Sequence, residues 1–191
     1  DVALLIVRSA YMQGQYDRVL AETESFPPEL DDSVSADLLG YRALALLQQQ
    51  KYRSADAVLE IALDLADDSV MALLAKASYE AQVGRLETAM GLASRAVEID
   101  PASAEGWALI GELLSARGNL TEARDAYDKA VASRPYVSML FARRAYINAQ
   151  MGEFAAADTD INKLLENGFK RVPYVNFVQG YTEFRRGNFA E

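Results

Sequence analysis

The chain contains no cysteine and no histidine among its 191 residues. Without thiols and imidazoles it can form no disulfide, no thiolate nucleophile, no imidazole general base and no metal site built from Cys and His ligands. The absence of cysteine fits the cytoplasm and the bacterial periplasm equally well, so it assigns no compartment.

Long apolar runs and clusters of basic residues are also missing. No stretch of 18 consecutive apolar residues occurs, so the sequence predicts no membrane span. The 28 acidic residues outnumber the 19 basic ones, which gives a net charge of −9. Because nucleic-acid binding depends on clustered Lys and Arg side chains, we expect no nucleic-acid partner.

Small residues recur at a fixed interval of 34 residues. Gly84, Gly118 and Gly152 are separated by this interval. The same interval separates three further sets: Ala55, Ala89, Ala123 and Ala157; Ala62, Ala96 and Ala130; and Pro101 and Pro135. A fixed period of this size indicates a repeat protein in which each unit is one supersecondary element.

The clearest unit covers residues 104–137. One apolar stripe at helical spacing and a second stripe after the turn at Gly118 predict two antiparallel helices. The first stripe consists of Trp107, Ile110, Gly111 and Leu114, and the second of Leu120, Ala123, Tyr127 and Ala130. We expect Gly111 and Ala123 to let the two helices approach closely, while Trp107 and Tyr127 fill the remaining core volume.

This pattern closely resembles the tetratricopeptide repeat (TPR) family. The resemblance implies an all-α fold, a right-handed α-solenoid of helix–turn–helix units. Complete units are expected at 36–69, 70–103, 104–137 and 138–171, a degenerate unit with its linker at 1–35, and a partial unit at 172–191. Three positions depart from the family pattern: Asp67 and Phe169 stand where Pro would close a unit, and Gln50 replaces a turn glycine. The polar stretch Glu29–Ser35 forms a slightly long connection after the degenerate unit.

Three short motifs could in principle carry chemistry. Asp158–Asn162 alternates carboxylates like a calcium loop, but Lys163 and Phe169 stand where such a loop needs Gly and Glu, so we expect a helix. The pairs Asp31-Asp32 and Asp67-Asp68 are expected to cap the helices that follow them. Asn119-Leu120-Thr121 matches a glycosylation sequon, but a turn followed by a helix start is the favoured interpretation. The sequence therefore predicts no catalytic, cofactor-binding or metal-binding residues.

In the TPR family the first helices of successive units line a concave face that holds ligands. The resemblance places the following residues in such a groove: Tyr41, Leu44, Gln48, Leu74, Ser78, Leu109, Glu112, Arg143, Tyr146 and Tyr181. The last unit adds Tyr174 and Phe177 to the same face. The groove lacks the Lys/Asn/Arg clamp of chaperone-binding members and the asparagine ladder of glycosyltransferase-type arrays. Its small, aliphatic and tyrosine side chains suit an apolar or amphipathic peptide or helix.

We therefore expect a non-enzymatic scaffold that binds another protein, without cofactors. Two alternatives stay open: the array is a self-association module, or it recruits substrates for a catalytic domain outside this sequence. The segment Tyr11–Asp17 resembles long TPR proteins of Gram-negative bacteria associated with exosortase (PEP-CTERM) sorting and exopolysaccharide export, which favours the bacterial periplasm or envelope over the cytoplasm. Because a motif is interrupted after Phe189, we expect the chain to be part of a longer array.

Overall fold

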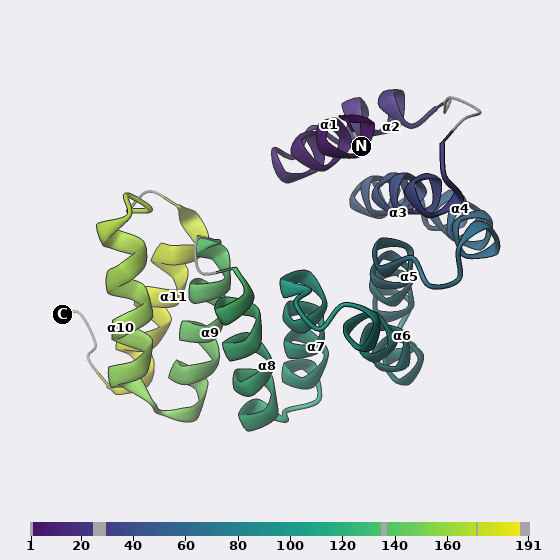
Figure 1. The fold of residues 1–191 in the computed structure, drawn as a ribbon. Coiled ribbons are helices and arrows are strands. Elements are labelled where there is room, and N and C mark those ends of the chain that lie inside the picture. The colour runs from purple at the N-terminus through teal and green to yellow at the C-terminus, as the bar shows by residue number, and fades with distance from the viewer. Residues whose placement is uncertain (1, 25–29, 135–136, 171, 188–191) are drawn as a thin grey trace. The chain divides into compact units, whose positions relative to one another are not determined.

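A computed structural model describes residues 2–24, 30–134, 137–170 and 172–187 (Figure 1). Within these residues the chain forms eleven α-helices and no strand, so the prediction of an all-α fold is confirmed. The helices are α1 (Val2–Met12), α2 (Tyr16–Glu22), α3 (Asp32–Gln48), α4 (Tyr52–Leu65), α5 (Val70–Gln82), α6 (Leu86–Ile99), α7 (Ala104–Ala116), α8 (Leu120–Ser133), α9 (Ser138–Met151), α10 (Phe154–Glu166) and α11 (Pro173–Arg186). Two residues of the repeat pattern, Pro135 and Phe189, lie outside the described residues.

The helices belong to two compact units, residues 1–101 with α1–α6 and residues 102–191 with α7–α11. In each unit consecutive helices pack as pairs, α1 with α2, α3 with α4 and α5 with α6 in the first, and α7 with α8 and α9 with α10 in the second. The first helix of a pair also packs on its counterpart in the neighbouring pair, as α3 does on α5 and α11 on α9. The exact boundaries of the sequence repeats stay a prediction.

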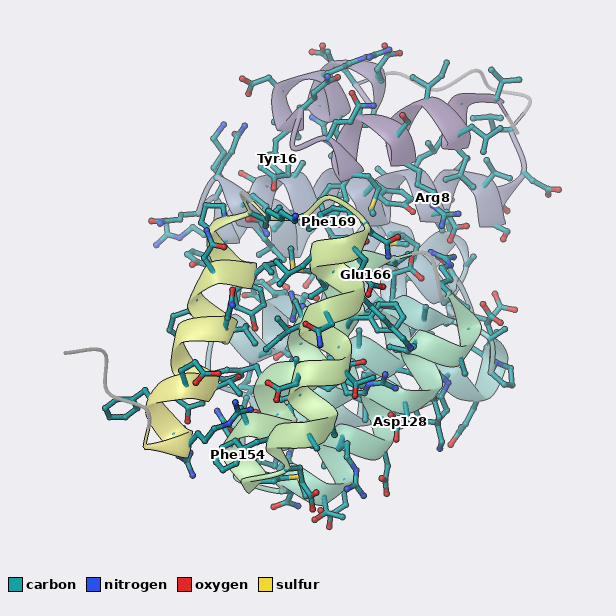
Figure 2. All side chains as sticks on the ribbon, turned by 90° about the vertical axis from the view of Figure 1, so that its left-hand side faces the viewer. Arg8, Tyr16, Asp128, Phe154, Glu166 and Phe169 are labelled. Carbon is teal, nitrogen blue, oxygen red and sulfur yellow. The ribbon has the colours of Figure 1, made fainter. Side chains whose placement is uncertain are left out.

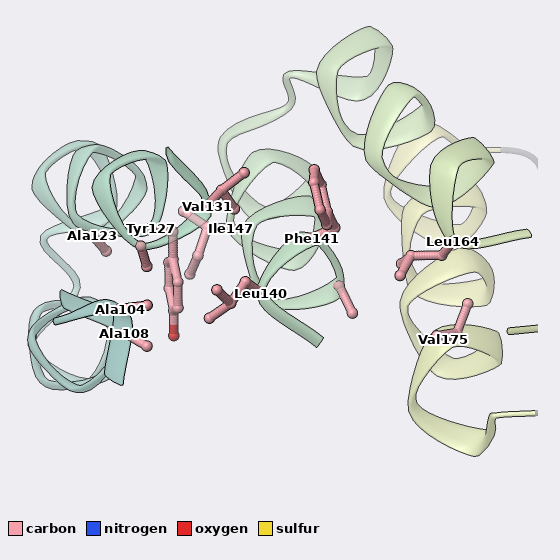
Figure 3. Packing of buried hydrophobic residues seen from close by; sticks show 12 residues of the cluster. Ala104, Ala108, Ala123, Tyr127, Val131, Leu140, Phe141, Ile147, Leu164 and Val175 are labelled. Atoms are coloured by element: carbon pink, nitrogen blue, oxygen red, sulfur yellow. The ribbon is translucent and has the colours of Figure 1, made fainter. Parts of the chain in front are cut away.

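A glycine sets the distance between α7 and α8. A Cβ atom added to Gly111 would lie 2.9 Å from Cε2 of the Tyr127 ring, so the ring occupies the space that a larger residue would need. In Figure 3 the Tyr127 side chain lies between Ala104 and Ala108 of α7 and Leu140 of α9. The predicted close approach at Gly111 is therefore confirmed.

Trp107 departs from its expected role as a core residue. Its side chain is half-buried at the edge of the apolar cluster that contains Tyr127. The Nζ atom of Lys129 lies 3.9 Å from the centroid of its ring, in the geometry of a cation–π contact. Tyr127 fills the centre of this core, and the Trp107 indole covers its side.

The turns between paired helices use the left-handed backbone region. Gly84, Gly118 and Gly152 have φ angles of 85°, 82° and 83°. Gln50 takes the same role in the turn between α3 and α4, with a φ of 58°, although it carries a Cβ atom. The repeat thus keeps its turn geometry where the family glycine is replaced, at the cost of a strained residue.

The helix starts differ from prediction at two places. α3 begins at Asp32, so four residues of the expected connection Glu29–Ser35 are helical. Serine, not an acidic pair, caps α5 and α7: Ser69 accepts a hydrogen bond from the amide of Ala72, and Ser103 accepts one from the amide of Gly106. Asp31 occupies the N-cap position of α3, but its side chain makes no capping hydrogen bond. The capping prediction is therefore wrong for Asp67-Asp68, because Ser69 stands directly before α5.

A basic residue at one position of the first helix links neighbouring helix pairs by hydrogen bonds. Arg42, Lys76 and Arg144 share the same register of the 34-residue period. Arg42 donates to a backbone carbonyl of α2 at 2.7 Å, Lys76 Nζ lies 2.5 Å from Asp56 Oδ1 on α4, and Arg144 lies 2.7 Å from Asp128 on α8. Each bond joins a first helix to the second helix of the preceding pair, so the position stabilises the stacking inside each unit.

Candidate functional site

The ten predicted groove residues all come from first helices, five in each unit. In the first unit they mostly serve packing. Tyr41 and Leu74 are only 6% and 5% exposed, and Leu44 and Ser78 are half-buried. The Ser78 hydroxyl donates to the carbonyl oxygen of Leu74 at 2.9 Å within its own helix. Gln48 is the exposed member of this set.

A tyrosine of α1 explains why Tyr41 is buried. The ring centroids of Tyr11 and Tyr41 lie 5.7 Å apart, and Tyr16 adds a third ring at 5.8 Å from Tyr11. Burial raises the pKa of the Tyr11 phenol, the neighbouring Tyr16 raises it further, and a hydrogen bond with Gln48 lowers it. The predicted groove residues of α3 are thus covered in part by the α1–α2 pair.

The predicted residues of the second unit lie on α7, α9 and α11. Leu109 and Glu112 come from α7, Arg143 and Tyr146 from α9, and Tyr181 from α11, and all five are half-buried. Arg143 forms an ion pair with Glu112 that joins α7 to α9. Burial lowers the pKa of Arg143, an effect that Tyr174 partly offsets. Arginine nevertheless stays protonated near neutral pH, so Arg143 and Glu112 form an ion pair that links two first helices.

Four aromatic side chains of α9 and α11 form one contiguous surface, which we call the aromatic face: Tyr146, Tyr174, Phe177 and Tyr181. The Tyr146 ring centroid lies 4.9 Å from that of Tyr181 and 5.8 Å from that of Phe177. Along α11, the Phe177 ring stacks on Tyr174 at 6.1 Å and on Tyr181 at 6.0 Å, with interplanar angles of 28° and 27°. Phe177 is 53% exposed, so a large apolar ring faces solvent at the centre of this surface.

Helical spacing explains how α11 presents these rings. Residues 174, 177, 181 and 184 follow one another by three or four positions and therefore share one side of the helix. Val175, Val178 and Thr182 lie on another side and are fully buried, so they fix α11 on the rest of the unit. Phe184, 60% exposed, extends the aromatic side by one further turn.

Arg185 holds the end of the aromatic face in place. Its Nη1 atom donates to the Tyr181 hydroxyl oxygen at 2.9 Å, and its Nη2 atom donates to the backbone carbonyl of Gln150 at 3.0 Å. The bond to Gln150 joins α11 to α9 at this point. The Tyr181 ring is therefore positioned by neighbours from both helices, Tyr146 on α9 and Arg185 on α11, before any ligand binds.

Some residues of these surfaces were missed by sequence reasoning. Phe184 was not assigned to the groove, although its helical spacing from Tyr181 was a usable signal. Tyr11, which covers Tyr41, was missed because the repeat pattern of the first pair is degenerate. The cations Arg42, Lys76 and Arg144 were also missed, and their 34-residue spacing would have identified them.

The carboxylates of Asp158–Asn162 make ion pairs with arginines. This segment lies within α10, as predicted, and Figure 2 shows Phe154 and Glu166 at the two ends of that helix. Asp160 accepts two hydrogen bonds from Arg144, from Nε at 2.8 Å and from Nη2 at 2.7 Å. Asp158 lies 2.5 Å from Nη2 of Arg186 on α11. These carboxylates therefore stabilise helix packing.

The described part of the chain contains neither a metal-ligand cluster nor a membrane-spanning helix. No group of three or more acidic, histidine or cysteine side chains there is arranged to hold a metal ion. None of its helices combines the length and apolar character that crossing a bilayer requires. Asn119, the first residue of the sequon, stands in the turn directly before α8, which confirms the structural interpretation of that motif.

Known structures with the same fold support this architecture. TTC0263 from Thermus thermophilus, a thermophilic TPR protein, superposes with a TM-score of 0.72 at 18% identity, covering 94% of this chain and 96% of that one. PilF from Pseudomonas aeruginosa gives a TM-score of 0.71 at 11% identity, covering 98% and 84%. YrrB, described as a TPR protein with an unusual peptide-binding site, gives 0.61 at 17% identity, covering 93% and 90%. At these identities the likeness shows the fold alone.

The family is established by the sequence match. No curated protein sequence matches the chain. The tetratricopeptide repeat family model matches residues 42–104 and 100–138, which together span about half of the chain. The paired helices, the turns with positive φ and the structural neighbours agree with that match. The chain belongs to the tetratricopeptide repeat family, whose fold serves as a scaffold for protein–protein interaction.

Proposed function

We propose that this protein is a non-enzymatic scaffold that binds an apolar or amphipathic peptide or helix of another protein on its first helices. The observation that carries the proposal is the aromatic face, where Phe177 is 53% exposed between two stacked tyrosines. The contact surface extends from these rings over Leu109 and the Glu112–Arg143 ion pair.

Aromatic side chains at such a surface supply most of the binding free energy in many interfaces. Each large ring buries apolar area at a low cost in side-chain entropy, and Tyr and Trp are enriched among the residues that dominate binding. An exposed cluster of contiguous rings is also unusual for a surface without a partner. The description of YrrB as a peptide-binding TPR protein gives a precedent within the same fold.

A peptide-display selection tests the proposal. Peptides selected on the wild-type protein are measured against Phe177→Ala and against Ile61→Ala, a control on α4 whose side chain is 55% exposed. We expect Phe177→Ala to weaken the selected peptides by about tenfold or more, and Ile61→Ala to leave their affinity unchanged. Equal affinities for all three proteins would place the binding surface elsewhere.

Self-association is the second candidate, and exposed residues of α1 favour it. Val2 and Leu5 are 72% and 65% exposed, and they lie on one side of the helix. Size-exclusion chromatography with light scattering over a dilution series decides between the two. A stable dimer that Leu5→Ser dissociates supports self-association, whereas a monomer at every concentration rules it out.

A bacterial envelope system, of the sorting or polysaccharide-export type, is the setting we propose for the partner. The proposal rests on the resemblance of the Tyr11–Asp17 segment. Cell fractionation of the protein in its source organism tests it, because recovery in the cytosol alone would exclude that setting.

A further inference from the structure

The aromatic face has the dimensions of an extended peptide. The two centroid distances along α11, 6.1 Å and 6.0 Å, bring the outer rings to at most about 12 Å apart. A polyproline II helix rises about 3.1 Å per residue, so about four of its residues cover this row. Tyr146, on α9, contacts two of these three rings and widens the row into a surface against which pyrrolidine rings can pack.

Hydrogen-bonding groups at the same surface also favour an extended backbone. The face carries the phenol groups of Tyr146, Tyr174 and Tyr181 beside the exposed Phe177 ring. A polyproline II helix has no internal hydrogen bonds, so its backbone carbonyls are free to accept from phenol hydroxyls. In an α-helix those carbonyls are already bonded within the helix, and only side chains remain to meet the phenols.

The balanced charges of the second unit favour a ligand without net charge. Glu112 and Arg143 neutralise each other, whereas Arg185, which donates to the Tyr181 hydroxyl and to a backbone carbonyl, keeps its positive charge at one end of the face. Residues 102–191 contain 11 acidic and 11 basic residues, so this unit has no net charge, whereas residues 1–101 contain 17 acidic and 8 basic ones. A strongly charged peptide meets little net field from this unit as a whole, and a proline-rich segment, which is neutral and stiff before binding, loses little entropy.

We propose that the aromatic face binds a proline-rich segment of another protein in the polyproline II conformation. This proposal rests on the proposed function and narrows its partner to one chemical class. Proline rings stack on Tyr174, Phe177 and Tyr181, and the phenol groups of Tyr146 and Tyr181 donate to the peptide carbonyls. Because proline rings and backbone carbonyls carry no net charge, the affinity is nearly independent of salt concentration.

Fluorescence anisotropy with two labelled probes tests the inference. The probes are an oligoproline peptide and a neutral amphipathic Leu/Gln helix. The proteins are the wild type, Phe177→Ala, the double variant Tyr146→Phe/Tyr181→Phe and the control Ile61→Ala, each first checked for an unchanged melting temperature. We expect oligoproline to bind the wild type and the control equally, and Phe177→Ala to weaken it by about tenfold or more. The double variant, which keeps both rings, weakens it by several-fold.

The other outcomes are distinguishable. If the Leu/Gln helix binds with the same dependence on Phe177 and oligoproline does not, the polyproline inference is wrong and the proposed function stands. If neither probe binds and display-selected peptides are insensitive to Phe177→Ala, both proposals fail. If the wild type is a dimer that Phe177→Ala converts to a monomer, the occupant of the face is a second copy, and the inference is overturned.

Discussion

Single residues decide how closely the paired helices approach. At Gly111 the absence of a side chain makes room for the Tyr127 ring. At position 148 a buried asparagine leaves its Oδ1 atom without a hydrogen-bond partner in a helix packed on α10 and α11. Gly111 therefore has a strict size requirement, and substitutions there have large effects on stability.

We predict that Gly111→Ala lowers the free energy of unfolding by about 1–3 kcal/mol, because the new methyl group overlaps the Tyr127 ring. Gly91→Ala in α6 is the matched control, since nothing lies within 4 Å of its Cβ position. In a helix interior that change is expected to stabilise by about 0.5–1 kcal/mol. Urea denaturation measures both, and a stabilising Gly111→Ala would contradict the packing described here.

We predict that the hydrogen bond between Asp56 and Lys76 makes the free energy of unfolding depend on pH. This hydrogen bond lowers the pKa of Asp56 below its ordinary value, so the carboxylate contributes stability above about pH 4, and this contribution is lost as the pH falls through the lowered pKa of the folded state. Asp56→Asn is therefore expected to be less stable than wild type at pH 7, with the difference shrinking at more acidic pH. Glu60→Gln, exposed on the same helix, is the control. A difference that is constant from pH 7 to pH 2 would refute the role assigned to the Lys76–Asp56 bond.

At the scale of the helices, the sequence pattern predicted the pairs but not all of their boundaries. The spacing of Gly84 and Gly118 marks turns, because glycine adopts the left-handed backbone conformation without strain. The spacing of Ala55 and Ala123 marks close helix contacts, because only small side chains fit there. The start of α3 was missed, because Asp31–Ser35 is polar in sequence although Val34 packs against the α1–α2 cluster. That contact depends on a distant helix, which local periodicity cannot reveal.

The turn between α3 and α4 provides a test at this scale. Gln50 adopts a positive φ of 58°, a conformation that glycine reaches without strain. We predict that Gln50→Gly raises the free energy of unfolding by about 1 kcal/mol. The reverse change, Gly118→Gln, is expected to lower it by a similar amount. Thermal denaturation followed by circular dichroism measures both, and a loss of stability in Gln50→Gly would contradict the assignment of strain to this turn.

At the scale of the whole molecule, the sequence was enough to predict the family. It predicted the residues of the binding surface only in part. The 34-residue period was sufficient to identify the TPR fold. It did not reveal that Tyr41 and Leu74 are buried, and the exposure of Tyr41 depends on how α1 covers it. It also did not separate the acidic first unit from the neutral second one, a difference that bears directly on the choice of partner.

Hydrogen–deuterium exchange with and without a display-selected peptide tests the central claim most directly. We predict that the peptide protects backbone amides of α9 and α11, around Tyr146 and from Tyr174 to Phe184, while exchange in the second helices α4, α6 and α8 is unchanged. Protection confined to those second helices, with α11 unaffected, would contradict the assignment of the aromatic face as the partner-binding surface.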